Sequence, residues 1–258
     1  RLGATGFVGG RVLRNLDRQG IRVEAVSRQS PPPGLSPNIG WTQADLNEPG
    51  AVAKIPWSET VISTVFVAMT AQVVEQWSPS ASRRLVAFSS TSALTKSNSS
   101  ESSDREISVL LSEGEARLRE LHPNVTILRP TMIYGGPGDR NVERVAQQLL
   151  KFPFFPLVGS GMGLRQPVHA DDLATAAVLS AKSSLASGKT YNLAGSEVLP
   201  FRQMIQRIGA ANNSAVRLVS IPLPAARIAL RLLSPFPRFR EIPLGSLERM
   251  NRDLVFDI

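Results

Sequence analysis

Three glycines at the beginning of the chain have a spacing that suits phosphate binding. They belong to the segment Gly3-Ala4-Thr5-Gly6-Phe7-Val8-Gly9. The first glycine permits a tight turn, the second lets the backbone approach an anion, and the third lets a helix pack on a strand. The N–H groups at the start of that helix would point at the anion. The alternative is a glycine-rich turn without a ligand. We predict contacts to a dinucleotide pyrophosphate from Gly3, Thr5, Gly6, Phe7, Val8 and Gly9.

The residues that follow the first predicted helix bear on the choice of dinucleotide. Apolar residues spaced along 8–16 predict the helix, and 21–26 reads as a strand. An acidic residue at the end of this strand would bind the ribose of NAD, but the chain has Ser27 and Arg28 there. A cation at this place favours the 2'-phosphate of NADP, whereas the alternative is that Arg28 is a surface arginine. We therefore expect NADP to be preferred over NAD.

Two further groups of residues come directly after predicted strands. Asp45 and Leu46 follow a strand at 41–44, and the hydroxyl run Ser89-Ser90-Thr91 follows a strand at 84–88. In a parallel sheet the carboxyl ends of the strands form the edge at which ligands bind. We expect Asp45 and Leu46 beside an adenine, and the hydroxyls on the same ligand side.

Predicted strands and helices alternate over about the first 130 residues, which is typical of a parallel sheet with helices on both faces. Beyond Tyr134 the pattern changes to a glycine loop, a helix at 141–150 and a segment at 152–156 that we expect to be irregular because of its prolines. A helix at 171–182 and a strand at 190–193 follow. The fold class is therefore α/β, a Rossmann-like doubly wound parallel sheet with a smaller C-terminal lobe.

Composition narrows the classes of function. The 258 residues have 42% hydrophobic content, no cysteine, two histidines and a net charge of +8. Disulfides and thiolate metal sites are excluded, and we expect no metal site. The net positive charge is typical of proteins that bind phosphorylated ligands or an anionic surface. The alternative is that these charges only form a basic, solvated surface.

No apolar run is long enough to span a membrane, so we expect a cytoplasmic protein. Because only two residues precede Gly3, we also expect that a few N-terminal residues are missing.

Several motifs follow one another along the chain. They are the glycine turn, Asp45-Leu46, Phe88-Ser89-Ser90-Thr91-Ser92, Leu128-Arg129-Pro130 with Ile133-Tyr134-Gly135, and 165–173, RQPVHADDL. Together they resemble the extended short-chain dehydrogenase/reductase family, in its branch of nucleotide-sugar epimerases and dehydratases. The resemblance implies a Rossmann domain at 1–134, to which 164–194 returns, and a substrate lobe made of 135–163 and 195–258. It also implies binding of NAD or NADP and of a nucleotide-linked sugar or a similar anionic small molecule.

The resemblance also implies roles for single residues. Ser89 and Ser90 would contact the cofactor, and Pro130 and Thr131 would lie by the nicotinamide. Thr91 matches the family's active-site hydroxyl. Arg165 would meet the diphosphate of the substrate.

One expected feature of the family is missing from the chain. Family members use a tyrosine followed four residues later by a lysine, which lowers the pKa of the phenol for proton exchange. Here Tyr134 and Tyr191 are followed four places on by glycines, and the alignment that we favour puts Val109 and Glu113 at the two positions. The usual proton shuttle is therefore absent.

Two residues are candidates to replace it. Lys96 lies in the loop after Thr91, and a partly desolvated lysine can act as acid or base. Glu113 could do so if burial favoured its protonated form. The alternatives are that Lys96 is a solvated loop residue and that Glu113 pairs with Arg117 on the same helix.

The function that we expect is an atypical epimerase/dehydratase-like oxidoreductase. The alternative is a non-catalytic NADP-binding sensor or assembly module. The segment 222–240 combines leucines, phenylalanines and arginines. It would make weak peripheral contact with an anionic membrane, or else pack inward with its arginines in solvent. We expect no nucleic-acid partner, and a homodimer is one oligomeric state to test.

Overall fold

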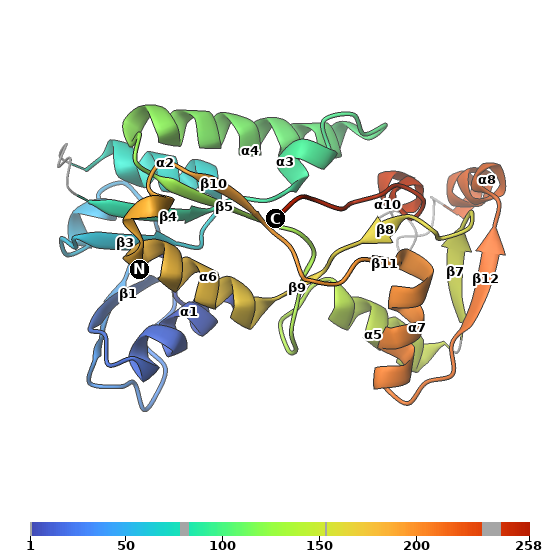
Figure 1. Cartoon of the computed structure of the whole chain (residues 1–258), viewed down its shortest axis with the longest axis horizontal. Helices are drawn as coiled ribbons and strands as arrows, with labels where there is room; N and C mark the ends of the chain where they lie inside the picture. The colour runs from blue at the N-terminus through green and yellow to red at the C-terminus, as the bar shows by residue number, and fades with distance from the viewer. Residues whose placement is uncertain (1, 78–82, 153, 234–243) are drawn as a thin grey trace.

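The computed structural model describes residues 2–77, 83–152, 154–233 and 244–258. It has two parts, which lie side by side in Figure 1. The N-terminal domain contains a central sheet between helices and the C-terminal lobe contains shorter strands and helices. In chain order the elements of the N-terminal domain are α1 (Phe7–Arg18), β1 (Val23–Ser27), β2 (Ile39–Gln43), β3 (Thr60–Ser63), α2 (Val67–Glu75), β4 (Arg84–Phe88), α3 (Ser92–Thr95), α4 (Ser102–Leu121), β5 (Thr126–Pro130), β6 (Ile133–Tyr134), β9 (Val168–His169), α6 (Ala170–Lys182) and β10 (Thr190–Leu193).

All pairs in the central sheet are parallel, as expected for a doubly wound fold. Four strands have the order β10-β5-β4-β3, and β1 pairs with β2. Leu2 joins the two groups, because it forms one bridge to Val26 of β1 and another to Ser63 of β3. The prediction of a Rossmann-like doubly wound sheet is confirmed.

Side chains that alternate along the strands form two apolar layers. In β4, Leu85 and Ala87 pack with α2 and α4, whereas Val86 and Phe88 pack with α1 and α6. Figure 1 shows α2 and α4 above the sheet and α1 and α6 below it. Because both faces are covered, the middle residues of these strands, Val61-Ile62, Leu85-Val86-Ala87 and Ile127-Leu128, are apolar on both sides of the sheet rather than alternating between polar and apolar.

The C-terminal lobe has its own small core. Its elements are α5 (Val142–Lys151), β7 (Phe154–Val158), β8 (Leu164–Arg165), β11 (Leu199–Pro200), α7 (Phe201–Ala211), β12 (Arg217–Ile221), α8 (Leu223–Leu233) and α10 (Leu244–Arg249). The core is formed by Leu149 of α5, Leu157 of β7 and Ile205 of α7 with their neighbours. Within the lobe β8 pairs with β11, and from residue 168 the chain returns to the N-terminal domain, where β9 pairs with β6 and β10 with β5.

The expectation that 152–156 is irregular was wrong for 154–156, which form part of a strand, whereas residue 153 lies outside the described residues. Strand β7 begins at Phe154 and continues through Pro156, which lies opposite Val219 of β12. These two strands form a two-stranded sheet, so each of them is an edge strand. A proline, which lacks a backbone N–H, is tolerated on an edge strand.

The basic segment at 222–240 is described only in part. Helix α8 covers its first half, and residues 234–240 lie outside the described residues. In α8 Ala226 is buried, whereas Ile228 and Leu232 are exposed. Among the helices in the described parts of the chain, none combines the length and the apolar character that crossing a bilayer requires.

Helices α2 and α4 approach each other closely at Gly114. A methyl group there would lie 2.8 Å from the backbone nitrogen of Ala68. We expect Gly114→Ala to lower the free energy of unfolding by about 1–3 kcal/mol, because overpacking against a backbone atom forces the helices apart. Urea unfolding measures this loss. Ser112→Ala at an exposed position of α4 is the control, with an expected change within about 0.5 kcal/mol. An equal effect of the two substitutions would contradict the assigned contact.

Candidate functional site

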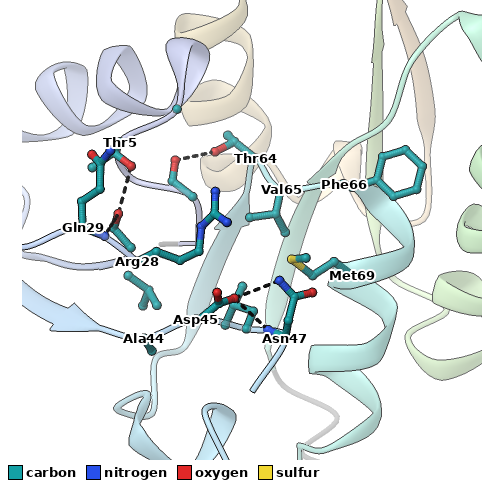
Figure 2. A pocket seen from close by; sticks show the side chains of 15 residues that line it. Thr5, Arg28, Gln29, Ala44, Asp45, Asn47, Thr64, Val65, Phe66 and Met69 are labelled. Atoms are coloured by element: carbon teal, nitrogen blue, oxygen red, sulfur yellow. Dashed lines mark hydrogen bonds between the residues drawn. The ribbon is translucent and has the colours of Figure 1, made fainter. Parts of the chain in front are cut away.

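A cavity of about 330 Å³ lies where Leu2, β1, β2 and β3 end. Its wall combines the glycine turn with the segments that follow three strands, and Figure 2 shows it from close by. This is the edge of the sheet at which the sequence predicted a dinucleotide. The cavity, called the smaller cavity below, is lined by Gly3, Thr5, Gly6, Val26, Ser27, Arg28, Gln29, Ala44, Asp45, Leu46, Asn47, Thr64, Val65, Phe66 and Met69.

The glycine turn has the geometry of an anion site. Gly3 has a positive φ of 76°, and a Cβ there would lie 2.9 Å from Oγ1 of Thr64. Gly6 is the N-cap of α1, provides no side-chain cap, and is followed by a first turn without an acidic residue. The first N–H groups of the helix therefore have no side-chain acceptor at the cap, and the helix dipole favours an anion there.

Of the six predicted turn residues, Gly3, Thr5 and Gly6 line the smaller cavity, and Phe7, Val8 and Gly9 do not. Val8 and Gly9 are buried in the first turn of α1. The ring of Phe7 lies beneath the guanidinium of Arg11, at 4.1 Å. These residues hold the start of the helix in place, and their backbone N–H groups remain the part that an anion would contact.

Arg28 reaches into the smaller cavity from the end of β1 (Figure 2). Its side chain is exposed, and no carboxylate of the described residues forms a salt bridge with it. Next to it, Oγ of Ser27 lies 2.9 Å from Oγ1 of Thr5 and accepts a hydrogen bond of 3.1 Å from the N–H of Gln29. The end of β1 therefore provides a cation and hydroxyl groups, and the acid of the same wall, Asp45, comes from the end of β2.

Asp45 and Leu46 both line the smaller cavity, as predicted from their place after a strand. The carboxylate of Asp45 accepts hydrogen bonds from the backbone N–H and the side-chain amide of Asn47, at 3.0 and 2.9 Å. Thr64, Val65 and other residues after β3 were not predicted to line the cavity. Their position after a buried strand is the signal that could have identified them, since they share the ligand edge of the sheet.

A second cavity, of about 590 Å³, lies between the N-terminal domain and the lobe. It combines hydroxyls and a lysine from the domain with arginines and apolar side chains, several of them from the lobe. It is called the larger cavity below. Its lining residues are Ser89, Ser90, Thr91, Ser92, Thr95, Lys96, Pro130, Thr131, Met132, Ile133, Asn141, Arg165, Gln166, Phe201, Arg249, Met250, Leu254 and Phe256.

The predicted residues Ser89, Ser90, Thr91, Pro130 and Thr131 all lie in the wall of the larger cavity. The hydroxyl of Thr91 is buried and donates a hydrogen bond of 3.1 Å to the carbonyl of Pro130. The hydroxyl of Thr131 donates a hydrogen bond of 2.5 Å to the carbonyl of Gln166, which lines the same cavity. Because the hydroxyl of Thr91 acts as the donor in its bond to Pro130, its oxygen can still accept a hydrogen bond from a ligand.

Glu115 is a buried carboxylate that connects α4 to the strands of the sheet. It is 1% exposed, accepts a hydrogen bond of 2.6 Å from Ser89, and forms salt bridges with Arg129 and Arg119. Burial alone would raise the pKa of Glu115, but the hydrogen bonds from Arg129 and Ser89 outweigh burial and hold the pKa below its usual value of 4.5. This residue was not among the predicted site residues.

Lys96 lines the larger cavity, but its ammonium group is not free. Nζ lies 2.7 Å from a carboxylate oxygen of Asp104, which also pairs with Arg249. Burial alone would raise the pKa of Asp104, but hydrogen bonds from Lys96, Arg249 and Ser99 outweigh it and hold the pKa below 3.8. Lys96 is therefore a partly buried, ion-paired lysine rather than a solvated loop residue.

The proposed alignment of Val109 and Glu113 with the catalytic pair does not agree with the structure. Both side chains are exposed on α4, and neither lines the larger cavity. Glu113 was a candidate only if it was buried, and this condition is not met. The face of α4 that turns to the sheet carries Asp104, Ser108, Leu111 and Glu115, so it has no tyrosine or lysine.

Arg165 is 3% exposed and lines the larger cavity. Nη1 donates to the carbonyls of Leu164 and Arg252, at 2.7 and 2.8 Å, and the guanidinium lies over the ring of Phe201 at 5.1 Å. Burial, together with the nearby charge of Arg249, lowers the pKa of Arg165 to about 10. The predicted substrate-binding arginine is therefore a buried cation fixed by backbone carbonyls.

Comparison with known proteins identifies one matching family model. The model, described as the NAD dependent epimerase/dehydratase family, matches residues 50–194. Among curated proteins, NADH dehydrogenase (ubiquinone) 1 alpha subcomplex subunit 9, mitochondrial, from Arabidopsis thaliana is 36% identical over 115 residues, which are 44% of this chain and 28% of that protein. The chain spans less than half the length of the curated relatives that it matches.

Solved structures show the same fold at low sequence identity. MoeE5 in complex with UDP-glucose and NAD is 21% identical, with a TM-score of 0.68 over 85% of this chain and 84% of that one. A short-chain dehydrogenase/reductase superfamily protein from Agrobacterium tumefaciens with bound NAD is 15% identical, with a TM-score of 0.68 over 96% and 93%. At these identities the similarity shows the fold alone.

The lowered pKa values of Glu115 and Asp104 predict a dependence of stability on pH. A carboxyl group with a lowered pKa in the folded state stabilises the fold fully above its unfolded pKa, and this stability is lost as the pH falls through the folded value. We therefore expect the melting temperature to be constant down to about pH 4.5 and to fall below it. Calorimetry over this pH range measures the effect.

Glu115→Gln is expected to lower the melting temperature at neutral pH and to flatten its decline in acid, because the paired charge is gone. The control is Glu113→Gln, which removes an exposed carboxylate two residues away and should change neither quantity. An acid dependence that Glu115→Gln leaves unaltered would assign the titration to other groups.

Proposed function

Since the chain belongs to the NAD dependent epimerase/dehydratase family, we propose that it binds NADP in the smaller cavity and a nucleotide-linked sugar, or a similar anionic small molecule, in the larger one. The resemblance to extended short-chain dehydrogenases/reductases is confirmed at the level of family and fold. What we propose beyond this is that the chain prefers NADP, that its substrate is a nucleotide sugar, and that it catalyses a reaction on that substrate.

One observation carries the proposal for the cofactor. The smaller cavity joins the uncapped start of α1, the glycine at positive φ and the ends of β1 and β2 in one wall. This is the combination that holds a pyrophosphate and an adenosine in dinucleotide-binding folds. Arg28 supports NADP over NAD, because its exposed cation lies where an acidic residue would select NAD.

The proposal for the substrate is supported by the charge in the larger cavity. Lys96, Arg165 and Arg249 line it, and the titratable carboxylates near them, Asp104 and Asp253, are not in its wall. A diphosphate between a base and a sugar is the kind of anion that such a wall attracts. The solved structure of MoeE5, which has this fold, contains UDP-glucose and NAD.

The chemistry that we propose is atypical for the family. NADP would supply hydride exchange at its nicotinamide. Thr91 would accept and orient a hydroxyl of the substrate, and the ammonium of Lys96, which Asp104 holds, would bind the anionic group of the substrate. Because the usual tyrosine and lysine are absent from α4, the proton of that hydroxyl would pass to solvent. Both side chains lie in the wall of the same cavity.

A second candidate is a non-catalytic NADP-binding subunit of a larger assembly. Two observations favour it. The face of α4 that turns to the sheet lacks the tyrosine and lysine, and a curated relative is named as a subunit of NADH dehydrogenase. In this case the cofactor would stabilise the fold that contacts the partner rather than exchange hydride.

Arg28→Ala tests the cofactor preference. Loss of a hydrogen-bonded charge is expected to weaken NADP binding by about tenfold or more and to leave NAD binding nearly unchanged. Isothermal titration calorimetry with both dinucleotides measures the ratio. Arg22→Ala, which removes an exposed arginine at the start of the same strand region, is the control. Equal losses for NADP and NAD would contradict a role for Arg28 in selecting the phosphate.

Thr91→Val separates the two candidate functions. If the chain is an enzyme, hydride transfer with UDP-glucose and related nucleotide sugars, followed by nicotinamide absorbance, should fall by about a hundredfold in this variant. Thr175→Val on the exposed side of α6 is the control and should keep its activity. Tight cofactor binding without turnover in the unmodified chain would favour the assembly subunit, and loss of a partner complex on removal of NADP would support it.

A further inference from the structure

A single buried carboxylate, Asp104, connects the two parts of the molecule beside the larger cavity. It lies in the first turn of α4 and is 5% exposed. One oxygen is 2.7 Å from Nζ of Lys96, and the other accepts hydrogen bonds from Arg249 and, at 3.0 Å, from Ser99. All of its partners are donors, so the carboxylate is satisfied although it is out of water.

The two cations that Asp104 holds come from different parts of the fold. Lys96 follows α3 in the N-terminal domain, and Arg249 is the last residue of α10 in the lobe. Both line the larger cavity, whereas Asp104 does not. The carboxylate therefore lies behind the wall, and the cations that it orients form part of the wall itself.

Other residues of α10 contact residues 99–104, the segment that contains Asp104. The N–H of Gly245 donates to Glu101 at 3.1 Å, and Glu248 accepts a hydrogen bond of 2.9 Å from Ser100. Gly245 packs so closely that a Cβ would lie 2.7 Å from a carboxylate oxygen of Asp104. Contact of the lobe with residues 99–104 thus brings Arg249 next to Lys96.

The three cations of the wall, Lys96, Arg165 and Arg249, have two carboxylates near them, Asp104 and Asp253, so one positive charge is in excess. Arg165, the third cation of the wall, is close enough to Arg249 for their charges to repel. An anion in the cavity would relieve this repulsion and gain charge-assisted hydrogen bonds.

We propose that Lys96 and Arg249 form an anion-binding subsite that spans the two parts of the molecule, and that Asp104 is the positioning residue that assembles it. The subsite would take a phosphoryl group. This inference rests on the proposed function, since the ligand that brings the phosphoryl group is the nucleotide-linked molecule of the larger cavity. It adds that binding of this group holds the lobe on the domain.

The first test needs no knowledge of the natural ligand. Acetylation by acetic anhydride, mapped by mass spectrometry, compares Lys96 with the exposed Lys54, Lys151 and Lys189. In the unmodified chain Lys96 is expected to react more slowly than these three, and inorganic pyrophosphate should slow it further. In Asp104→Asn it should react as fast as they do, and pyrophosphate should no longer protect it.

The second test measures affinity. Asp104→Asn is expected to weaken binding of UDP-glucose by about tenfold or more, the loss of a charge-assisted contact, with NADP affinity unchanged. Arg249→Gln should weaken UDP-glucose binding in the same way, which keeps the test valid if Asp104→Asn does not fold. Glu106→Gln is the matched control, because it removes an exposed carboxylate two residues further along α4 that forms no salt bridge with a described residue, and it should leave UDP-glucose binding unchanged.

The outcomes separate this inference from the proposed function. If the unmodified chain binds no UDP-glucose but pyrophosphate protects Lys96, the proposed ligand is wrong and the subsite stands. Rapid acetylation of Lys96, or the absence of protection by pyrophosphate, would overturn the subsite. Tighter binding of UDP-glucose by Asp104→Asn would show that Asp104 competes with the ligand rather than positioning its partners, and would also overturn it.

Discussion

The pairing of Leu2 with two strands is the contact on which the rest of the structure depends. Its N–H donates to the carbonyl of Ile62, its own carbonyl accepts from Thr64, and it bridges Val26 as well. Without these bonds β1 and β2 would not belong to the same sheet as β3, β4 and β5. Because Gly3 follows directly, the backbone bonds that close the sheet also place the glycine turn at the carboxyl edge of its neighbours.

Two buried carboxylates on α4 extend this organisation from the backbone to the side chains. Glu115 fixes the helix to β5 through Arg129 and to the end of β4 through Ser89, while Asp104, at the other end, reaches Lys96 and the lobe. A buried carboxylate without partners would be costly, so each must keep its cations close. The spacing between the helix, the sheet and the lobe is therefore set partly by charge, and the larger cavity lies in the space that results.

The wall of the smaller cavity was predictable from single residues because its signals are local. Gly3, Gly6, Arg28 and Asp45 each lie just after a strand or just before a helix, and the parallel arrangement requires the strand ends to meet at one edge. The wall of the larger cavity was less predictable. Whether Lys96 is solvated and whether Glu113 is buried depend on which face of α4 turns inward and on what approaches from the lobe, and neither is set by neighbouring residues.

By itself the sequence determined the fold class and the place of the glycine turn, because apolar periodicity and glycine positions act through backbone sterics over a few residues. Its motifs also indicated the family, which the family model confirmed. Only the tertiary structure decided that Asp104 pairs with both Lys96 and the remote Arg249, that Glu115 is buried whereas Glu113 is exposed, and that Arg165 is held by carbonyls. Such pairings need groups that are remote in the chain to lose their water together, and a sequence pattern does not record which of them meet.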